Sequence, residues 1–167
     1  MAKSCGYATT SCEYKFPKND EEELTRAEMA KWIYSFAYVN LLTEGEKIAE
    51  KALEYLGSNY VWGGTGPHSF DCSGFTYYIM GLFGHSIGRD CDAQYLNGER
   101  IEYEDLRPGD IVLFARTYAS SGMTHAGLYI GNSYFIHAAN SRSGVIITNL
   151  NDEYYYSHFV CGRRIVN

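Results

Sequence analysis

The sequence predicts an α+β fold in which helices, one of them starting with a cysteine, pack on an antiparallel β-sheet. Two observations lead to this prediction. An apolar run that can bury one helical face follows Cys72, and the C-terminal half contains short apolar segments separated by turn residues. A chain that changes from a helical to a strand period in this way is typical of an α+β domain.

The N-terminal half predicts an irregular arm followed by helices. Residues 1–20 contain Gly, Ser, Thr, Asn and Pro without a lasting period, and therefore predict the arm. Residues 24–42 and 43–56 predict two helices, because apolar residues in the second recur at near-helical spacing. A further helix begins at Cys72, and a short turn or helix is expected at residues 91–96.

The second half predicts five strands, near residues 110–114, 124–130, 134–138, 145–149 and 158–165. The dipeptide Gly131-Asn132 between two apolar runs is typical of a β-hairpin. With the turn at these residues, position 125 is expected roughly opposite position 138. His125 and His137 then lie on adjacent strands, although parity across a turn does not by itself place them on one face.

Composition limits the class of protein. The chain has 167 residues, of which 46% are hydrophobic, enough for one compact domain with an N-terminal extension. A net charge of −6 and the lack of basic patches argue against a nucleic-acid partner. No segment reaches the roughly 18 apolar residues of a membrane span, and no signal-peptide core is visible. The sequence does not indicate an oligomeric state.

Cys72, His125 and His137 are candidate catalytic residues. A lone cysteine before an apolar helix is more often a small buried residue, and a strand histidine is more often structural. Here a glycine-rich loop precedes the cysteine, the helix start favours thiolate, and two histidines lie on adjacent strands, which together favour a nucleophile with a base. Zinc is disfavoured because C-x-x-C and H-x-x-x-H spacings are absent, and no metal or cofactor is expected.

These motifs resemble the NlpC-type cell-wall endopeptidases, which are papain-like cysteine peptidases of bacteria and their phages. The similarity runs from about residue 48 to residue 166, and its segments occur in the family's order at residues 60–64, 70–75, 89–94, 106–114, 125–131 and 135–139. It implies a papain-like fold, with a catalytic domain at residues 46–167 after an N-terminal extension at residues 1–45. Residues 16–30 also resemble the second half of an S-layer homology repeat, a cell-wall anchoring module.

The resemblance implies a role for each residue of the triad. Cys72 is the nucleophile, His125 the base, and His137 the polar third member that orients the ring of His125. The backbone N–H of Cys72 at the helix start is a natural oxyanion donor. The family similarity adds the hydroxyl of Tyr60 near the same oxyanion.

The implied substrate is a peptidoglycan stem peptide, cut between γ-D-Glu and a diamino acid. Ser73 is expected to donate to the D-Glu carboxylate. Asp71 has two possible roles, binding a free α-amine or capping the helix, and one carboxylate does not fully serve both. Cys91 stands where the family usually has serine. Because a thiol is a weak donor, Cys91 either lines the pocket and binds the carboxylate less well or is only packed.

Several alternatives stay open. An amidase or a lipid acyltransferase on the same fold would keep Cys72 and His125, whereas a wall-binding module would need a broken triad. The resemblance implies an extracellular or cell-wall-associated protein, and leaves open whether diaminopimelate or lysine follows D-Glu and whether a free L-Ala amine is needed. Cys5 and Cys12 could pair in an oxidising setting. The tyrosines at residues 154–156 suit ligand stacking, but half-buried strand positions are the favoured interpretation.

Overall fold

The computed structural model describes residues 41–117 and 121–166, and the chain from Thr43 onwards forms one compact unit. The expected arm at residues 1–20, the S-layer-like segment and nearly all of the expected helix at 24–42 lie outside the described residues. The predicted domain boundary after residue 45 lies in the first turn of helix α2 (Glu44–Leu53), three residues past the start of the compact unit, and it stays a prediction.

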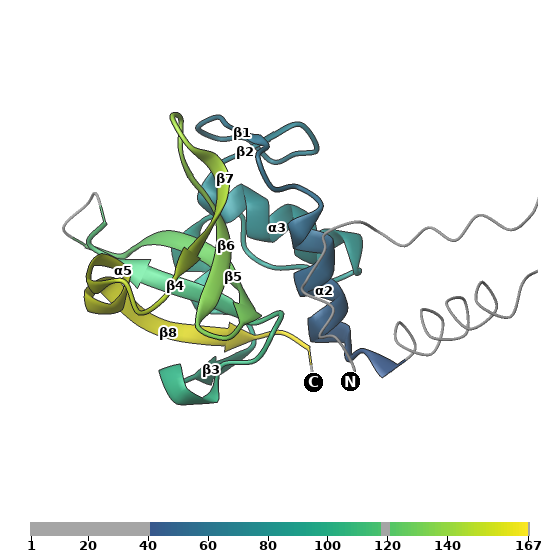
Figure 1. Ribbon diagram of the computed structural model, residues 1–167, viewed down its shortest axis with the longest axis vertical. Coiled ribbons are helices and arrows are strands. Elements are labelled where there is room, and N and C mark those ends of the chain that lie inside the picture. Colours follow the sequence, from purple (N-terminus) through teal and green to yellow (C-terminus); the bar gives the residue numbers. More distant parts are fainter. Residues whose placement is uncertain (1–40, 118–120, 167) are drawn as a thin grey trace, which may run out of the picture. The chain divides into compact units, whose positions relative to one another are not determined.

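The described part consists of helices and short strands, shown in Figure 1. The helices are α2, α3 (Cys72–Leu82), α4 (Cys91–Tyr95) and α5 (Glu153–His158), with a 3-10 turn at Tyr103–Asp105. The strands are β1 (Asn59–Tyr60), β2 (Ser69–Phe70), β3 (Glu99–Ile101), β4 (Ile111–Ala115), β5 (Met123–Gly131), β6 (Tyr134–Asn140), β7 (Gly144–Asn149) and β8 (Phe159–Arg164). None of the helices in these described ranges is both long enough and apolar enough to cross a bilayer.

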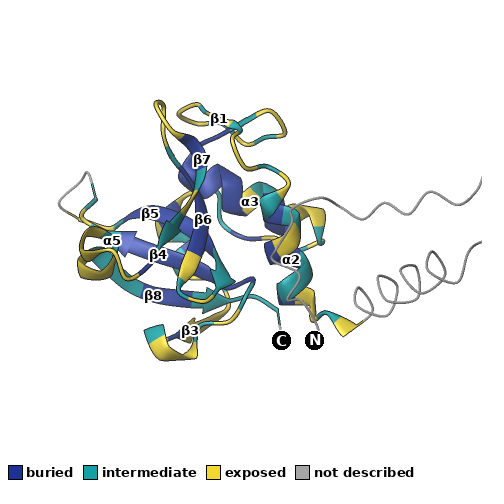
Figure 2. Ribbon diagram, viewed as in Figure 1, coloured by how far each residue is buried: buried dark blue, intermediate teal, exposed yellow. Residues whose placement is uncertain are grey.

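Six strands form one antiparallel sheet in the order β3-β8-β4-β5-β6-β7, and β1 and β2 form a separate parallel pair. Helix α3 packs against β5 and β6, while α2 and α4 pack against β5 (Figure 1). Figure 2 shows that α3 and the central strands are the most buried elements. The predicted α+β fold, with the cysteine helix packed on an antiparallel sheet, is confirmed.

The sheet separates two apolar clusters because its side chains alternate between its faces. In β4, Ile111 and Leu113 join the large cluster beneath α2 and α3, whereas Val112 and Phe114 join a smaller aromatic cluster on the other face. All four are fully buried. The aromatic cluster also contains part-buried rings from α5 and from the chain around it, so both faces of β4 are covered.

The β5–β6 hairpin turns one residue later than predicted. Asn132 and Ser133 have φ values of 52° and 64°, as the two central residues of a type I′ turn require. Gly131 is therefore not a turn residue but pairs with Tyr134, beside a bulge in β5. The expected position of residue 125 opposite 138 is therefore wrong by one. The observed pairs, Leu128 with Ile136 and Tyr129 with Phe135, extrapolate to 125 opposite 139.

This register puts the two histidines on one face of the sheet. Continuing it places His137 opposite Gly127, two residues from His125 and therefore on the same face. A Cβ added to Gly127 would lie 2.7 Å from the Phe135 ring and 3.1 Å from Cβ of His137. Glycine at this position lets the two strands approach closely enough for the histidine rings to meet.

The tyrosines at residues 154–156 belong to helix α5, so the favoured interpretation as strand residues was wrong. Tyr154 and Tyr156 are exposed, while Tyr155 packs into the aromatic cluster. The β-propensity of tyrosine suggested a strand. In the structure these residues form a short helix, and only the Tyr155 ring of the three packs inward. The predicted strand at 158–165 is present as β8, which starts after this helix.

Candidate active site

Cys72 is the first residue of α3, and a side-chain cap fixes the start of that helix. Asp71 has an extended backbone, and its Oδ1 accepts a hydrogen bond of 2.6 Å from the N–H of Gly74. A Cβ at Gly74 would lie 2.0 Å from the carbonyl oxygen of Gly64, so the glycine-rich loop packs directly on the first helical turn. The N–H of Cys72 has no acceptor within its own helix, which leaves it available to a ligand.

The sulfur of Cys72 is held as a thiolate. The pKa of Cys72 is lowered to about 4. The largest cause is the Cys91 thiol, whose Sγ lies 4.0 Å from Sγ of Cys72. Burial opposes this effect, whereas a hydrogen bond and charge from His125 and the N–H of Ala126 add to it. The contact with Cys72 and burial raise the pKa of Cys91 far above its ordinary value. Cys72 is therefore the thiolate of the pair and Cys91 the thiol.

The two histidine rings meet edge to face between β5 and β6. Nε2 of His125 lies 2.6 Å from Nδ1 of His137, with ring centroids 4.8 Å apart and planes at 90°. This contact occupies Nε2 of His125, so Nδ1 is the nitrogen left to face the thiolate. His125 is thus placed between the Cys72 sulfur and His137, the polar third residue of the candidate site.

Thr148 in β7 fixes the proton positions on His137. Its Oγ1 lies 3.0 Å from Nε2 of His137. Burial, with a smaller contribution from the charge of His125, keeps the pKa of His137 well below its usual range, so this ring is neutral. We assign its proton to Nε2, donated to Thr148, because Nδ1 can then accept from the Nε2–H of His125.

Aromatic rings surround the histidine pair. Phe135 stacks on His137 at 4.5 Å, and Tyr155 meets His137 edge-on at 5.3 Å. Phe114 lies 5.9 Å from His125. These rings exclude water from the outer side of the pair and restrict the ring orientations, which explains why the His137 pKa is lowered.

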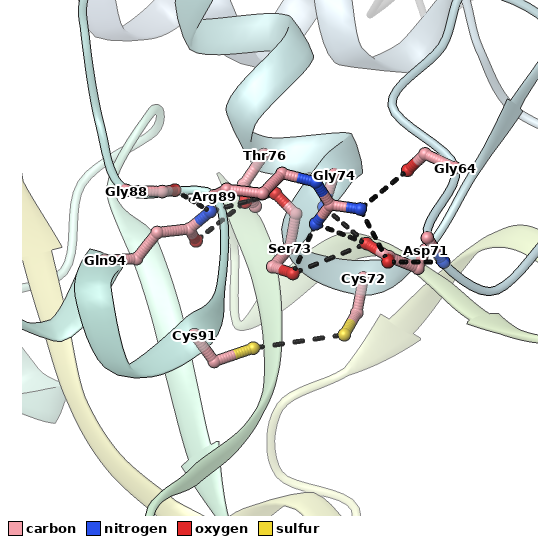
Figure 3. A network of polar contacts seen from close by, with 11 residues as sticks. Gly64, Asp71, Cys72, Ser73, Gly74, Thr76, Gly88, Arg89, Cys91 and Gln94 are labelled. Atoms are coloured by element: carbon pink, nitrogen blue, oxygen red, sulfur yellow. Dashed lines mark hydrogen bonds and ion pairs between the residues drawn. The ribbon is translucent and has the colours of Figure 1, made fainter.

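An ion pair lies beside Cys72, as Figure 3 shows. Arg89 donates from Nη2 to Oδ2 of Asp71 at 2.7 Å and from Nη1 to Oδ1 at 3.0 Å. Asp71 Oδ2 also accepts from the N–H of Gly63, and Arg89 Nη1 lies 3.0 Å from Oγ of Ser73. Asp71 is therefore the helix cap and the partner of Arg89, a guanidinium to which the sequence motif gave no role.

A buried amide holds Cys91 in place. Gln94, fully buried in α4, donates from Nε2 to the carbonyl oxygens of Ser73 and Gly88, each at 2.9 Å, and accepts from Oγ1 of Thr76 at 2.8 Å (Figure 3). These bonds tie α4 to the first turn of α3. Cys91, the first residue of α4, is thereby positioned next to Cys72.

A cavity of about 510 Å³ opens over this region. Its lining residues are Trp62, Gly63, Asp71, Cys72, Ser73, Arg89, Asp90, Cys91, Asp92 and Met123. Of the residues that line it, Arg89 is the single cationic side chain, whereas Asp71, Asp90 and Asp92 are carboxylates. One positive and three negative formal charges leave the lining with a formal charge of −2. The cavity thus offers one cation beside an acidic wall.

The structure brings together most of the residues predicted from the sequence. Asp71, Cys72, Ser73 and Cys91 line one cavity, and His125 reaches Cys72 while it binds His137. Tyr60 lies in β1, partly buried against the large core cluster, and is not among the lining residues of this cavity. Its role at the oxyanion stays a prediction.

Three neighbours of the candidate site were given no role in the sequence analysis: Arg89, Gln94 and Thr148. Tyr155 was considered there only for ligand stacking, not as a contact of His137. Arg89 and Gln94 flank Cys91 in one motif, and a cation beside a cysteine and aspartates was the signal available for Arg89. The contact of Thr148 with His137 depends on the β6–β7 register, in which Thr148 pairs with Phe135. No sequence-local signal indicates that contact.

A thiolate at a helix start, a histidine next to it and a neutral hydrogen-bond acceptor behind that histidine are the groups that acyl transfer by a cysteine uses. On this α+β framework they define a papain-like cysteine peptidase. Across residues 41–117 and 121–166, no group of three His, Cys, Asp or Glu side chains is arranged to hold a metal ion.

Comparisons with known proteins agree with this class. The model of the NlpC/P60 family matches residues 57–164. A probable endopeptidase of Corynebacterium glutamicum is 45% identical over 99 residues, which cover 59% of this chain and 45% of the relative. A gamma-D-glutamyl-L-lysine dipeptidyl-peptidase of Bacillus cereus is 36% identical over 110 residues, 66% of this chain and 33% of the relative.

Among solved structures, an NlpC/P60 family protein from Bacillus cereus superposes with a TM-score of 0.70 at 32% identity, covering 75% of this chain and 41% of that chain. The chain belongs to the NlpC/P60 family, a family of cysteine peptidases that act on peptidoglycan. It spans less than half the length of these relatives.

Proposed function

We propose that this chain is a cysteine endopeptidase that hydrolyses peptidoglycan stem peptides at the bond between γ-D-Glu and the diamino acid. The observation that carries the proposal is the 2.6 Å contact between the rings of His125 and His137, together with the lowering of the Cys72 pKa by His125. The printed name of the Bacillus cereus dipeptidyl-peptidase supports the choice of bond. An extracellular or wall-associated location follows from such a substrate.

The chemistry uses the charge states of the site. The Cys72 sulfur attacks the amide carbonyl, and the His125 imidazolium gives its Nδ1 proton to the leaving amine, which departs as the thioester forms. Neutral His125 then takes a proton from water, whose oxygen attacks the thioester and releases the acid and the thiolate. Throughout, His137 accepts from Nε2–H of His125 and so keeps Nδ1 directed at the reacting atoms.

The developing oxyanion needs donors near the nucleophile. The N–H of Cys72 at the start of α3 is one, and the positive end of the helix adds to its effect. The Tyr60 hydroxyl is the second donor of this proposal. Losing one such donor typically lowers the rate by about 10²-fold or more.

Arg89 and Ser73 bind the free carboxylate of D-Glu in this proposal. The Arg89 side chain is 36% exposed and lines the cavity, and Oγ of Ser73 lies 3.0 Å from its Nη1, so the two donors converge. The Nη groups of Arg89 already donate to Asp71, Ser73 and Gly64, so Arg89 attracts the carboxylate through its charge and its remaining Nε–H. Cys91, on the cavity wall beside them, contributes a weak thiol donor.

A free L-Ala amine contributes little to binding through Asp71. Both oxygens of Asp71 already accept hydrogen bonds, and its charge is paired with Arg89. An amine would share the carboxylate with that guanidinium. Acetylating the N-terminus of a stem peptide is therefore expected to lower kcat/KM by less than about fivefold, as for a partly screened ion pair.

The test is digestion of defined fragments followed by mass spectrometry. The substrates are L-Ala-γ-D-Glu-L-Lys-D-Ala, its diaminopimelate counterpart, their N-acetylated forms and the corresponding muramyl peptide, each with Cys72→Ala as the control. Release of L-Ala-D-Glu, or of muramyl-L-Ala-D-Glu, is the expected result. Release of an intact tetrapeptide from muramic acid would identify an amidase instead, and binding without any cleavage would identify a wall-binding module.

A further inference from the structure

Cys72 and Cys91 each occupy the first position of a helix, and their sulfur atoms lie 4.0 Å apart on the wall of one cavity. We propose that this pair is a site of reversible oxidation, in which a peroxide oxidises Cys72 and Cys91 then captures the oxidised sulfur as an intramolecular disulfide. The family resemblance gives Cys91 only the place of a pocket serine, and the oxidation site goes beyond the peptidase activity proposed above.

The geometry allows the bond. A disulfide needs sulfur atoms about 2.05 Å apart, so the present separation must close by about 2 Å, a distance within reach of small rotations of two side chains. Both side chains border open cavity space, which gives them room to turn. The Gln94 bonds hold the two helix starts together.

The order of reaction follows from the charge states. Thiolates, not thiols, attack peroxides, and Cys72 is the thiolate of the pair. The largest cause of the raised Cys91 pKa is its contact with that thiolate. Once Cys72 is a neutral sulfenic acid, this cause is gone and Cys91 loses its proton more easily. Oxidation of the first sulfur therefore activates the second.

The two steps balance with peroxide as the oxidant. The Cys72 thiolate attacks one peroxide oxygen, an S–O bond forms, the O–O bond breaks, and the hydroxide released takes the proton of the His125 imidazolium. The Cys91 sulfur then attacks Sγ of Cys72, the S–S bond forms, the S–O bond breaks, and the departing hydroxide leaves as water with the Cys91 proton. Two thiol groups lose two electrons, and one peroxide becomes two waters.

The disulfide has two consequences. It removes the nucleophile, so hydrolysis stops, a consequence that rests on the proposed function. It also protects Cys72 from sulfinic and sulfonic acids, which ordinary thiols do not reduce. A site without Cys91 would instead lose its nucleophile irreversibly under the same oxidant.

The experiment treats the reduced full-length chain with hydrogen peroxide, blocks remaining thiols, digests without reductant and maps linked peptides by mass spectrometry. Hydrolysis of stem peptide is measured before and after dithiothreitol, each variant relative to its own reduced form. The variants are Cys91→Ser, which lacks the capturing thiol, and Cys161→Ala, which removes a fully buried thiol of β8 as a matched control.

The wild type and Cys161→Ala are expected to form a peptide pair joined through Cys72 and Cys91, to lose activity at least about tenfold, and to recover it with dithiothreitol. Cys91→Ser is expected to accumulate sulfinic acid at Cys72 and to recover nothing. Sulfinic acid at Cys72 in the wild type without the linked pair, or linkage of Cys72 to Cys5 or Cys12, would overturn the proposal. The wild-type map alone decides this if Cys91→Ser does not fold. A chain that forms the bond yet cuts no stem peptide would overturn the proposed function alone.

Discussion

At the start of α3, the groups around Cys72 are charged and border a cavity, whereas the histidines of β5 and β6 lie among aromatic rings away from water. Asp71 and Arg89 form an ion pair beside the nucleophile, and the Arg89 side chain keeps 36% of its surface exposed. His137, in contrast, is fully buried against Phe135. The two halves meet where His125 and the N–H of Ala126 act on the Cys72 sulfur.

This difference assigns a task to each half. The helix end stabilises negative charge on the Cys72 sulfur and, in the proposed reaction, on the oxyanion. The aromatic half keeps His137 neutral, since a charged ring there would lose hydration and face the charge of His125. In the proposed mechanism a charged third residue is not needed, because neutral His137 accepts from the ring of His125 and orients it. The predictions below separate the contributions of the two halves.

The largest effect is expected from removing the nucleophile. Cys72→Ala leaves the cap, the ion pair and the histidines in place but eliminates the covalent step, so hydrolysis should fall by about 10³-fold or more. Assays on stem peptides measure it, and thermal unfolding checks that the variant is folded. Residual activity above a few per cent of wild type would exclude Cys72 as the nucleophile.

The second effect concerns the thiolate. With a Cys72 pKa of about 4, the thiolate persists at neutral pH, and its iodoacetamide alkylation rate should fall only as the pH drops through that value. His125→Ala removes a hydrogen bond and a charge, so the alkylation midpoint should move upward, towards the roughly 8.5 of a free cysteine. A wild-type midpoint near that of free cysteine would contradict the ion pair.

The third effect isolates the aromatic half. His137→Phe keeps a ring in the cluster but removes the acceptor for Nε2–H of His125. We therefore expect kcat/KM to fall about 10- to 100-fold, no more than the smallest losses that follow removal of a general base itself. His137→Gln, which supplies a carbonyl oxygen, should recover part of the loss. The pH profile of kcat/KM is the deciding measurement, because a purely structural role would leave its shape unchanged. A loss as deep as that of Cys72→Ala would show a larger role for His137.

The sequence predicted the helix end better than the aromatic half, for a physical reason. Asp71, Cys72 and Gly74 are neighbours in the chain, so the cap and the helix start follow from local rules. The histidine pair depends on a register, and the bulge beside Gly131 shifted the hairpin turn by one residue. The Arg89 ion pair joins residues 18 apart, which no local pattern encodes. The strands themselves were found because apolar alternation is also local.

The fourth effect tests the packing around the histidines. Tyr155→Ala removes the ring that meets His137 edge-on and contacts Phe135, so kcat/KM should fall about tenfold and the protein should lose about 1–3 kcal/mol of stability. Tyr155→Phe keeps the ring and should match the wild type in both. Tyr156→Ala, at a position 61% exposed, is the control on the same helix. Equal losses in the phenylalanine variant would assign the effect to the hydroxyl, whose pKa burial raises to about 12.

The smallest effect is expected at the charged half, from Cys91→Ser. The hydroxyl is a stronger donor than the thiol and shares the cavity wall with Ser73 and Arg89, where the D-Glu carboxylate is proposed to bind. One added neutral hydrogen bond of about 0.5–1.5 kcal/mol should raise kcat/KM for stem peptides by about two- to tenfold, mainly through KM. Steady-state kinetics of reduced wild type and variant measure it. An unchanged kcat/KM in a folded variant would exclude Cys91 from carboxylate binding and leave it only the contact with the Cys72 sulfur. The charged half would then recognise the substrate through Arg89 and Ser73 alone.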